Sequence, residues 1–392
     1  MIMKNARQLS LLLLVIIFTA ACKKEKTEDQ GGPPPPMTQV DIAKVDQQVE
    51  AFISRFSVPG ASLAVSKNGK LVYRKGYGLA DKESGEKVTA DHRFRLASVS
   101  KTFTAAAILK LVEAGKLSLA DKVFGAGAIL GTAYGTQPYS ANLTNITVSH
   151  LLHNTSGGWG AGSGGDPIDM NPQMSNDDFL NWVIDNKPVK YAPGTRYDYS
   201  NTGFFTAGRI IEKLSGKPYA SYIKEMVSAV NDKNTDVAGP ALSDRKTKEV
   251  KYYGQGNDGQ WTYTMALKRR DADGGLMTTA TDLLRFINAI DGSTTRPDIL
   301  KASSLAAMTT GSGAAPLSNS YGLGIGLWDD LWYNYGSLPG TRTGFMRSSN
   351  GTCVALLLNS RQENDTFVYA MQDLMLVFIN DNSITWQNID QF

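Results

Sequence analysis

The sequence predicts an α+β fold in which an antiparallel sheet, built from N- and C-terminal segments and flanked by helices, carries a mostly helical inserted subdomain. Two observations lead to this prediction. An Asn-Gly pair lies between apolar runs near each end of the chain, at Asn68-Gly69 and Asn350-Gly351, and this pattern is typical of a β-hairpin. Between the pairs lie several helical stretches, separated by long loops rich in Gly, Ser, Asn and Pro.

The N-terminal elements are a helix followed by a hairpin. Residues 41–56 predict an amphipathic helix that ends before Pro59. Its apolar stripe is formed by Val45, Val49, Phe52 and Ile53. Residues 61–65 and 71–74 flank Asn68-Gly69, so we expect them to be paired strands.

The C-terminal elements mirror this order. Residues 342–347 and 352–358 flank Asn350-Gly351 and predict a second hairpin. Residues 365–379 predict a closing helix. The longest irregular stretches lie in the middle of the chain, over 154–176 and 231–260, and we expect substrate specificity to depend on these loops.

Composition excludes one class of partner. The chain has 392 residues, of which 42% are hydrophobic, which is enough for one large domain or two small ones. The formal net charge is only +3, and basic residues form no run apart from a short stretch near the N-terminus. We therefore expect no nucleic-acid partner, whereas the oligomeric state stays open.

The first residues predict export. Residues 1–22 combine the basic Lys4 and Arg7, an apolar run over 11–18, and small residues before Cys22, as in a secretory leader. The position of Cys22 resembles the lipobox of bacterial lipoproteins, whose cysteine is acylated and becomes the mature N-terminus. An ordinary cleaved leader with a chance cysteine is the alternative.

A lipid on Cys22 would place the chain in the bacterial cell envelope, at the outer membrane. Residues 23–40 are charged and proline-rich, which predicts a flexible tether without a core. Residues 41–385 are then the folded domain, held near the membrane by the anchor.

Metal and disulfide chemistry is not expected. The only other cysteine, Cys353, has no partner within the mature domain. Neither Cys353 nor the histidines His92, His150 and His153 have the sequence spacing of a metal-ligand set. We therefore predict neither a metal nor a cofactor, and no effect of a chelator on activity.

A candidate nucleophile is Ser98, followed by Lys101 one helical turn later. The spacing alone is weak, because it recurs at Ser84/Lys87, Ser221/Lys224 and Ser243/Lys246. Only Ser98 opens a helix with an apolar stripe, over residues 101–114, so backbone N–H groups there would favour an oxyanion. On this segment alone, a helix-capping serine with a surface lysine explains the pattern equally well.

A second candidate segment contains Tyr199 and Asn201. A tyrosine acts as a general base only when cations hold down its pKa, and the ammonium of a nearby lysine would do so. The amide of Asn201 could contact that lysine or a substrate carbonyl. Taken alone, Tyr-Ser-Asn is most often a turn.

Together these segments resemble the serine β-lactamase-related family, which includes class C β-lactamases, D-alanyl-D-alanine carboxypeptidases, esterases and penicillin-binding proteins. The resemblance spans about residues 45–380. It is carried by the stretch 94–121 around Ser98-Val99-Ser100-Lys101, by 146–157, by 192–201 ending in Tyr199-Ser200-Asn201, and by Asp273-Gly274-Gly275-Leu276 with Asp282. It implies a β-lactamase/transpeptidase-like fold, with Ser98 as the acylated nucleophile and Lys101 and Tyr199 as joint proton-transfer groups.

The third motif of that family is altered here. Asn334-Tyr335-Gly336-Ser337 aligns where Lys-Thr-Gly or His-x-Gly is expected, so an uncharged amide stands in place of a cation. Attraction for a substrate carboxylate and electrostatic help to Tyr199 should both be reduced. The N–H groups of Ser98 and Ser337 would still form an oxyanion hole. The residues expected to bind substrate are Asn201, Asn334, Gly336 and Ser337. Efficient β-lactamase action is not expected.

The resemblance implies a serine hydrolase of the cell envelope that forms an acyl-enzyme on Ser98. The expected substrate is a small molecule or a peptidoglycan peptide, cleaved by a D-alanyl-D-alanine carboxypeptidase-like or an esterase or peptidase activity. The alternative is a catalytically weak penicillin-binding or sensor-type protein that keeps the fold but lacks charge at Asn334.

Overall fold

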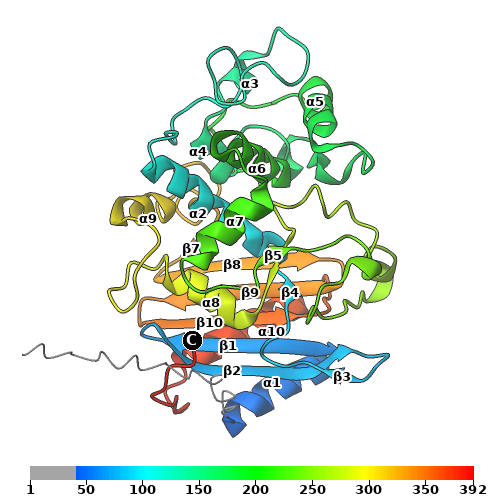
Figure 1. Ribbon diagram of the computed structural model, residues 1–392, viewed down its shortest axis with the longest axis vertical. Coiled ribbons are helices and arrows are strands. Elements are labelled where there is room, and N and C mark those ends of the chain that lie inside the picture. The colour runs from blue at the N-terminus through cyan, green and yellow to red at the C-terminus, as the bar shows by residue number, and fades with distance from the viewer. Residues whose placement is uncertain (1–40) are drawn as a thin grey trace, which may run out of the picture. The chain divides into compact units, whose positions relative to one another are not determined.

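The computed structural model describes residues 41–392 and confirms the predicted α+β class (Figure 1). Its main feature is a seven-stranded antiparallel sheet with the order β3-β2-β1-β10-β9-β8-β7. A small sheet, β4-β6-β5, lies beside it. The predicted leader, Cys22 and the tether over 23–40 lie outside the described residues.

The strands and helices are bounded as follows. The strands are β1 Gly60–Lys67, β2 Lys70–Asp81, β3 Glu86–Lys87, β4 Phe94–Arg95, β5 Asp236–Val237, β6 Leu276–Thr278, β7 Gly326–Trp328, β8 Leu331–Leu338, β9 Thr341–Ser348 and β10 Thr352–Leu358. The helices are α1 Ala43–Arg55, α2 Ser100–Glu113, α3 Ala141–Thr144, α4 Val148–Leu152, α5 Asn176–Asn186, α6 Asn201–Ser215, α7 Tyr219–Ser228, α8 Ala280–Asn288, α9 Ala302–Met308 and α10 Asp365–Asn380.

Both ends of the chain meet in the middle of the large sheet. β1 pairs with β10 in a register that runs from Ala61 opposite Leu358 to Lys67 opposite Thr352. The turn between β1 and β2 has positive φ at Asn68 (49°) and Gly69 (73°), as a two-residue hairpin turn requires. The predicted N-terminal hairpin therefore forms, and its second strand extends further than predicted, to Asp81.

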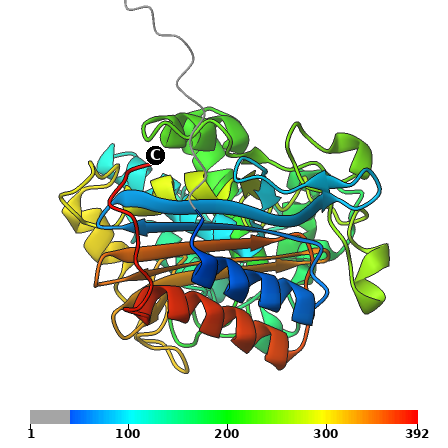
Figure 2. The ribbon, with the colours of Figure 1, turned by 90° about the horizontal axis from the view of Figure 1, so that it is seen from below.

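The sheet is covered on both faces, so its central strand β10 is buried along its whole length. In β10 the side chains of Val354, Leu356 and Leu358 belong to the core shared with α1 and α10. Figure 2 shows these two helices side by side against that face. The alternate residues Ala355 and Leu357 belong to the larger core, which contains the helical insertion.

Helix α2 lies inside that larger core. We expected an apolar stripe, but every side chain from Ser100 to Leu109 is buried. The reason is its position, because α2 contacts α6, α7 and α9, and the turn before it contacts β8. A helix enclosed in this way holds its first turn rigidly.

Cys353, His150 and His153, considered in the sequence, are buried or hydrogen-bonded within the protein. Cys353 is buried in β10 with a free thiol. His150 accepts a hydrogen bond from the backbone N–H of Thr147, and His153 contacts the carbonyl of Thr310. Over residues 41–392 the structure shows no group of three or more His, Cys, Asp or Glu side chains that could hold a metal ion. In the same range, no helix has the length and apolar character needed to span a bilayer.

Candidate active site

Ser98 lies at a sharp turn between β4 and α2. It is the middle residue of a 3₁₀ turn, Ala97–Val99, that continues into α2. Ala97 has a φ of +48°, a left-handed conformation that a residue with a Cβ rarely adopts. The surrounding packing holds this strained backbone in place, and Ser98 alone among the three turn residues is partly exposed.

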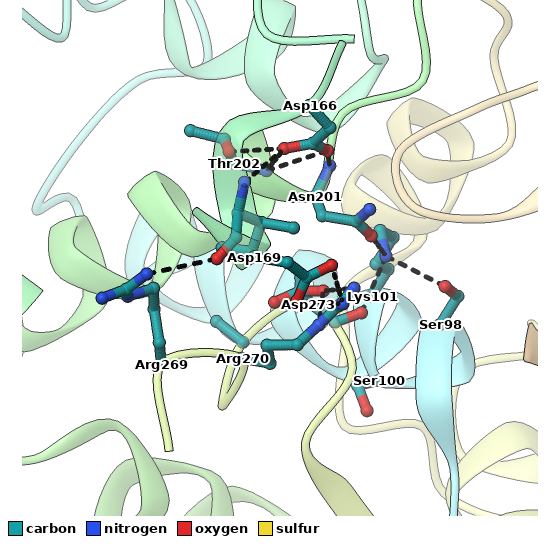
Figure 3. Close-up of polar contacts among 12 residues, drawn as sticks. Ser98, Ser100, Lys101, Asp166, Asp169, Asn201, Thr202, Arg269, Arg270 and Asp273 are labelled. Atoms are coloured by element: carbon teal, nitrogen blue, oxygen red, sulfur yellow. Dashed lines mark hydrogen bonds and ion pairs between the residues drawn. The ribbon is translucent and has the colours of Figure 1, made fainter. Parts of the chain in front are cut away.

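Lys101 follows one turn later and is fully buried. Its Nζ contacts three oxygens: Ser98 Oγ at 3.1 Å, Asn201 Oδ1 at 2.8 Å and the carbonyl of Asp273 at 2.7 Å (Figure 3). An ammonium would donate to all three. A neutral amine would donate to two and accept the Ser98 hydroxyl proton with its lone pair, so Lys101 can change protonation state without moving.

Tyr199 reaches Ser98 from the start of α6. Ser200 caps this helix by accepting a hydrogen bond from the N–H of Gly203, which fixes Tyr199 just before the first turn and Asn201 within it. The Tyr199 hydroxyl donates to Ser98 Oγ at 2.7 Å. Ser98, Lys101, Tyr199 and Asn201 are therefore brought together, as the sequence predicts.

The pKa values assign different resting states to the two proton-transfer groups. The pKa of Lys101 is lowered to about 7, mainly by burial; the charge of Asp273 opposes this shift and that of Arg270 adds to it. Burial raises the pKa of Tyr199 well above its usual value, although its hydrogen bond to Ser98 opposes this. The expectation that a lysine ammonium depresses the Tyr199 pKa is wrong, because desolvation of the phenolate outweighs nearby charge.

A charged network lies behind Lys101, buried at Asp273 and Arg270 and exposed at Asp169. Arg270 donates from Nη2 to Asp273 Oδ2 at 2.9 Å and from Nη1 to both oxygens of Asp169, at 2.9 and 3.0 Å (Figure 3). Asp273 is fully buried, and its backbone carbonyl is the one that Lys101 contacts. The network therefore holds the Lys101 amine in position through the backbone carbonyl oxygen of Asp273.

Asp166 extends this network to the start of α6. Its carboxylate accepts hydrogen bonds from the N–H of Asn201 and, at 2.6 Å, from the Thr202 hydroxyl. A carboxylate at a helix N-terminus stabilises the first turn. Asn201 is thus held at both its backbone and its side chain.

Asn334 lies on β8, and its side-chain amide is hydrogen-bonded to neighbouring protein oxygens. Its amide nitrogen lies within hydrogen-bonding distance of the Ser98 carbonyl (3.3 Å), Thr102 Oγ1 (3.0 Å) and the Gly324 carbonyl (3.1 Å). These contacts tie β8 to the first turn of α2. The same contacts occupy the donor that was expected to meet a substrate.

Gly336 and Ser337 border the nucleophile. A Cβ on Gly336 would lie 2.0 Å from the Leu96 carbonyl, so only glycine permits this approach of β8 to the Ser98 turn. Leu338 closes the β8–β9 hairpin opposite Thr341, so Ser337 is a non-hydrogen-bonded position whose N–H points away from β9. This orientation suits an oxyanion donor.

Two depressions meet at Ser337. The first, here called the Ser98 pocket, encloses about 440 Å³ and is lined by Ser98, Tyr199 and Asn201 together with Tyr197, Arg270, Leu317, Ser320, Tyr321, Gly326, Tyr333, Asn334, Tyr335 and Ser337. The second, here called the Trp261 pocket, encloses about 460 Å³. It shares Arg270 and Ser337 with the first and adds Trp261 and Met265.

Comparison with known proteins now identifies the family. The profile of the Beta-lactamase family matches residues 45–375. The chain belongs to the beta-lactamase family. Family members are generally serine hydrolases, and the cluster around Ser98 in this beta-lactamase family protein has the residue types that such chemistry uses.

Relatives of this family protein include penicillin-binding proteins. Protein flp of Staphylococcus aureus (strain NCTC 8325 / PS 47) is 30% identical over 180 residues, which are 46% of this chain and 35% of flp. The match thus spans about a third of that relative. The putative penicillin-binding protein PbpX of Bacillus subtilis (strain 168) is 27% identical over 332 residues, covering 83% of this chain and 76% of PbpX.

A solved structure shares the fold. D-amino acid amidase from Ochrobactrum anthropi SV3, complexed with L-phenylalanine, superposes with a TM-score of 0.67 at 23% identity. The superposition covers 86% of this chain and 98% of the amidase. At this identity the likeness establishes the common architecture.

Proposed function

We propose that this chain is a serine hydrolase that forms an acyl-enzyme on Ser98, with a D-alanyl-D-alanine carboxypeptidase-like or an esterase or peptidase activity. One observation carries the proposal. Ser98 Oγ is contacted at once by a buried amine, at 3.1 Å, and by a phenol, at 2.7 Å, and it opens onto a pocket. A serine hydroxyl becomes a nucleophile when a base is placed in this way.

The proposed reaction has two halves. Ser98 Oγ bonds to the carbonyl carbon of the substrate while its proton passes to Lys101, and the N–H groups of Ser98 and Ser337 stabilise the oxyanion. Lys101 and Tyr199 together return the proton to the leaving atom as its bond to carbon breaks. Water then attacks the acyl-enzyme, giving its proton to the same groups, and the Ser98 hydroxyl is restored.

A catalytically weak penicillin-binding or sensor-type protein is the second candidate. The uncharged Asn334, with its amide committed to Ser98, Thr102 and Gly324, supports it. The complete set of Ser98, Lys101, Tyr199 and Asn201 within bonding distance favours the hydrolase, because an inactive relative gains nothing from preserving that geometry.

The experiment that tests the proposal combines labelling with turnover. Purified protein is incubated with a fluorophosphonate and, separately, with a labelled penicillin, then weighed intact and mapped by peptide mass. We expect one fluorophosphonate adduct per chain, on the Ser98 peptide, together with hydrolysis of esters or D-Ala-D-Ala peptides. An adduct without any turnover would favour the sensor-type protein, and no adduct with either reagent would refute both.

The pKa of Lys101 predicts the pH dependence of acylation. Because the neutral amine accepts the Ser98 proton and its pKa is lowered to about 7, the acylation rate should rise through pH 7 and level off above it. Below pH 7, protonation of Lys101 should reduce the rate about tenfold per pH unit. The rate of fluorophosphonate labelling from pH 5 to 9 measures this. A flat profile, or a midpoint near 10, would contradict the assignment.

We also propose that Cys22 carries a lipid that holds the domain in the bacterial envelope, as the leader pattern predicts. A Cys22→Ala variant, expressed in bacteria fed an alkyne-tagged fatty acid, should lose the label that the unaltered chain carries. Cys353→Ala is the matched control and should keep it, since that thiol is buried in β10. Continued labelling of Cys22→Ala would refute the anchor.

A further inference from the structure

We infer that the Ser98 pocket receives an uncharged, apolar or aromatic leaving group, so that the substrate is an ester or amide without a free carboxylate next to the scissile bond. This inference rests on the proposed function and chooses between its two substrate classes. It disfavours a D-alanyl-D-alanine carboxypeptidase, whose leaving amino acid carries a carboxylate.

The proton donor decides which pocket holds the leaving group. In the tetrahedral intermediate, the leaving atom is bonded to the same carbon as Ser98 Oγ and must lie within reach of the Tyr199 hydroxyl to be protonated. Tyr199 lines the Ser98 pocket and does not line the Trp261 pocket. The leaving group therefore lies in the Ser98 pocket, and the acyl part extends past Ser337 towards Trp261.

The wall facing the leaving group is formed by phenols. The rings of Tyr197 and Tyr321 meet edge to face with centroids 5.4 Å apart, and Tyr333 and Leu317 line the same pocket. Burial raises the pKa of all three tyrosines, so they are neutral at physiological pH. Aromatic faces are electron-rich and attract apolar groups while repelling anions.

Among the described residues that line the Ser98 pocket, no cationic side chain is free to pair with an anionic substrate group. Arg270 is the charged side chain there, and its Nη1 is committed to Asp169 while Nε and Nη2 bind Asp273. Asn334 is neutral, and its amide nitrogen already meets three protein oxygens. A carboxylate in this pocket would lose water and could gain only neutral hydroxyl donors, without an opposite charge to balance it.

A pair of substrates tests the inference directly. The benzyl and 4-carboxybenzyl esters of N-acetyl-D-alanine share an acyl group, and their leaving alcohols differ mainly in charge. We expect kcat/KM to be at least about 10-fold higher for the benzyl ester, since one unmatched charged contact corresponds to about a decade. Equal rates, or a preference for the 4-carboxybenzyl ester, would overturn the inference.

A charge placed on the wall provides the reciprocal test. Leu317 is 36% exposed, so Leu317→Arg should fold and add an unpaired guanidinium to the Ser98 pocket. We expect it to raise kcat/KM for the 4-carboxybenzyl ester about 5- to 10-fold relative to the benzyl ester. Leu242→Arg is the matched control, because Leu242 is 44% exposed and lines neither pocket, and it should leave the ratio unchanged.

The remaining outcomes separate the inference from the proposed function. An unchanged ratio in Leu317→Arg, with both esters still cleaved, would show that the leaving group lies elsewhere and would overturn the inference. If neither ester is cleaved while Ser98 still forms the fluorophosphonate adduct, the inference is also overturned, but the assignment of Ser98 as the reactive serine is retained. Absence of the adduct would remove the proposed function and this inference together.

Discussion

Replacing Ser98 by alanine is expected to lower the hydrolysis rate by at least about 10⁴-fold, down to the level that binding and the oxyanion hole alone support. The change removes the oxygen atom that Lys101 Nζ and the Tyr199 hydroxyl both contact. Ester hydrolysis under saturating substrate and fluorophosphonate labelling both measure it, and labelling should vanish.

Ser221→Ala is the matched control for this prediction. Ser221 is followed by Lys224 at the same spacing, but it is exposed on α7, and Lys224 pairs with Asp236 instead. Activity should stay within about twofold of the unaltered chain, as for most exposed positions. If Ser98→Ala kept its activity, or if Ser221→Ala lost it, the nucleophile would be misassigned.

Replacing Lys101 by methionine should have the next largest effect, slowing acylation about 10³- to 10⁴-fold. Methionine fills much of the same buried volume but cannot accept the Ser98 proton. It also leaves Asn201 Oδ1 and the Asp273 carbonyl without the donor that now satisfies them at 2.8 and 2.7 Å. The rate constant of fluorophosphonate labelling isolates this step from deacylation.

Lys110→Met, in the same helix, is the control for Lys101→Met. Lys110 Nζ binds the Ile299 carbonyl at 2.8 Å, and its side chain is 37% exposed, so the variant should acylate at the normal rate. Circular dichroism and thermal unfolding of both variants separate lost chemistry from lost folding. A folded Lys101→Met that labels as fast as the Lys110 variant would exclude Lys101 as the base.

The sequence predicts those parts of the fold whose causes are local. Asn68-Gly69 specifies a tight turn by its own backbone preferences, and the helix over 41–56 follows from its apolar stripe. The small sheet could not be predicted in this way. β5 and β4 each contribute two residues, and they join only through β6, far away in the chain.

The candidate site is likewise predictable in part from the sequence. Ser98 and Lys101 share one turn of helix, so their contact follows from spacing, and Tyr199 and Asn201 join them through the family resemblance. The pairing of Arg270 with Asp169 could not be found in this way, because Asp169 lies about a hundred residues earlier, in a 3₁₀ turn of a long loop. The one available signal was the charged run 269–273 directly before Gly274-Gly275, since such a run between apolar segments must be solvated or paired.

The resting protonation states of Lys101 and Tyr199 likewise could not be predicted from the sequence. Desolvation governs the pKa of both Lys101 and Tyr199. It depends on how completely α2 is enclosed, and the sequence showed only one apolar stripe of that helix. The commitment of the Asn334 amide to Ser98, Thr102 and Gly324 likewise appears only when β8 is laid against α2.

The pairing of β1 with β10 also constrains how the protein is made. β1 is synthesised early, but its neighbour β10 is available only after nearly 300 further residues have been synthesised. Contacts of such high sequence separation slow folding, and until they form β1 exposes a bare apolar edge that can recruit other chains. Truncation just before Thr352 should therefore yield an aggregating polypeptide rather than a smaller folded one.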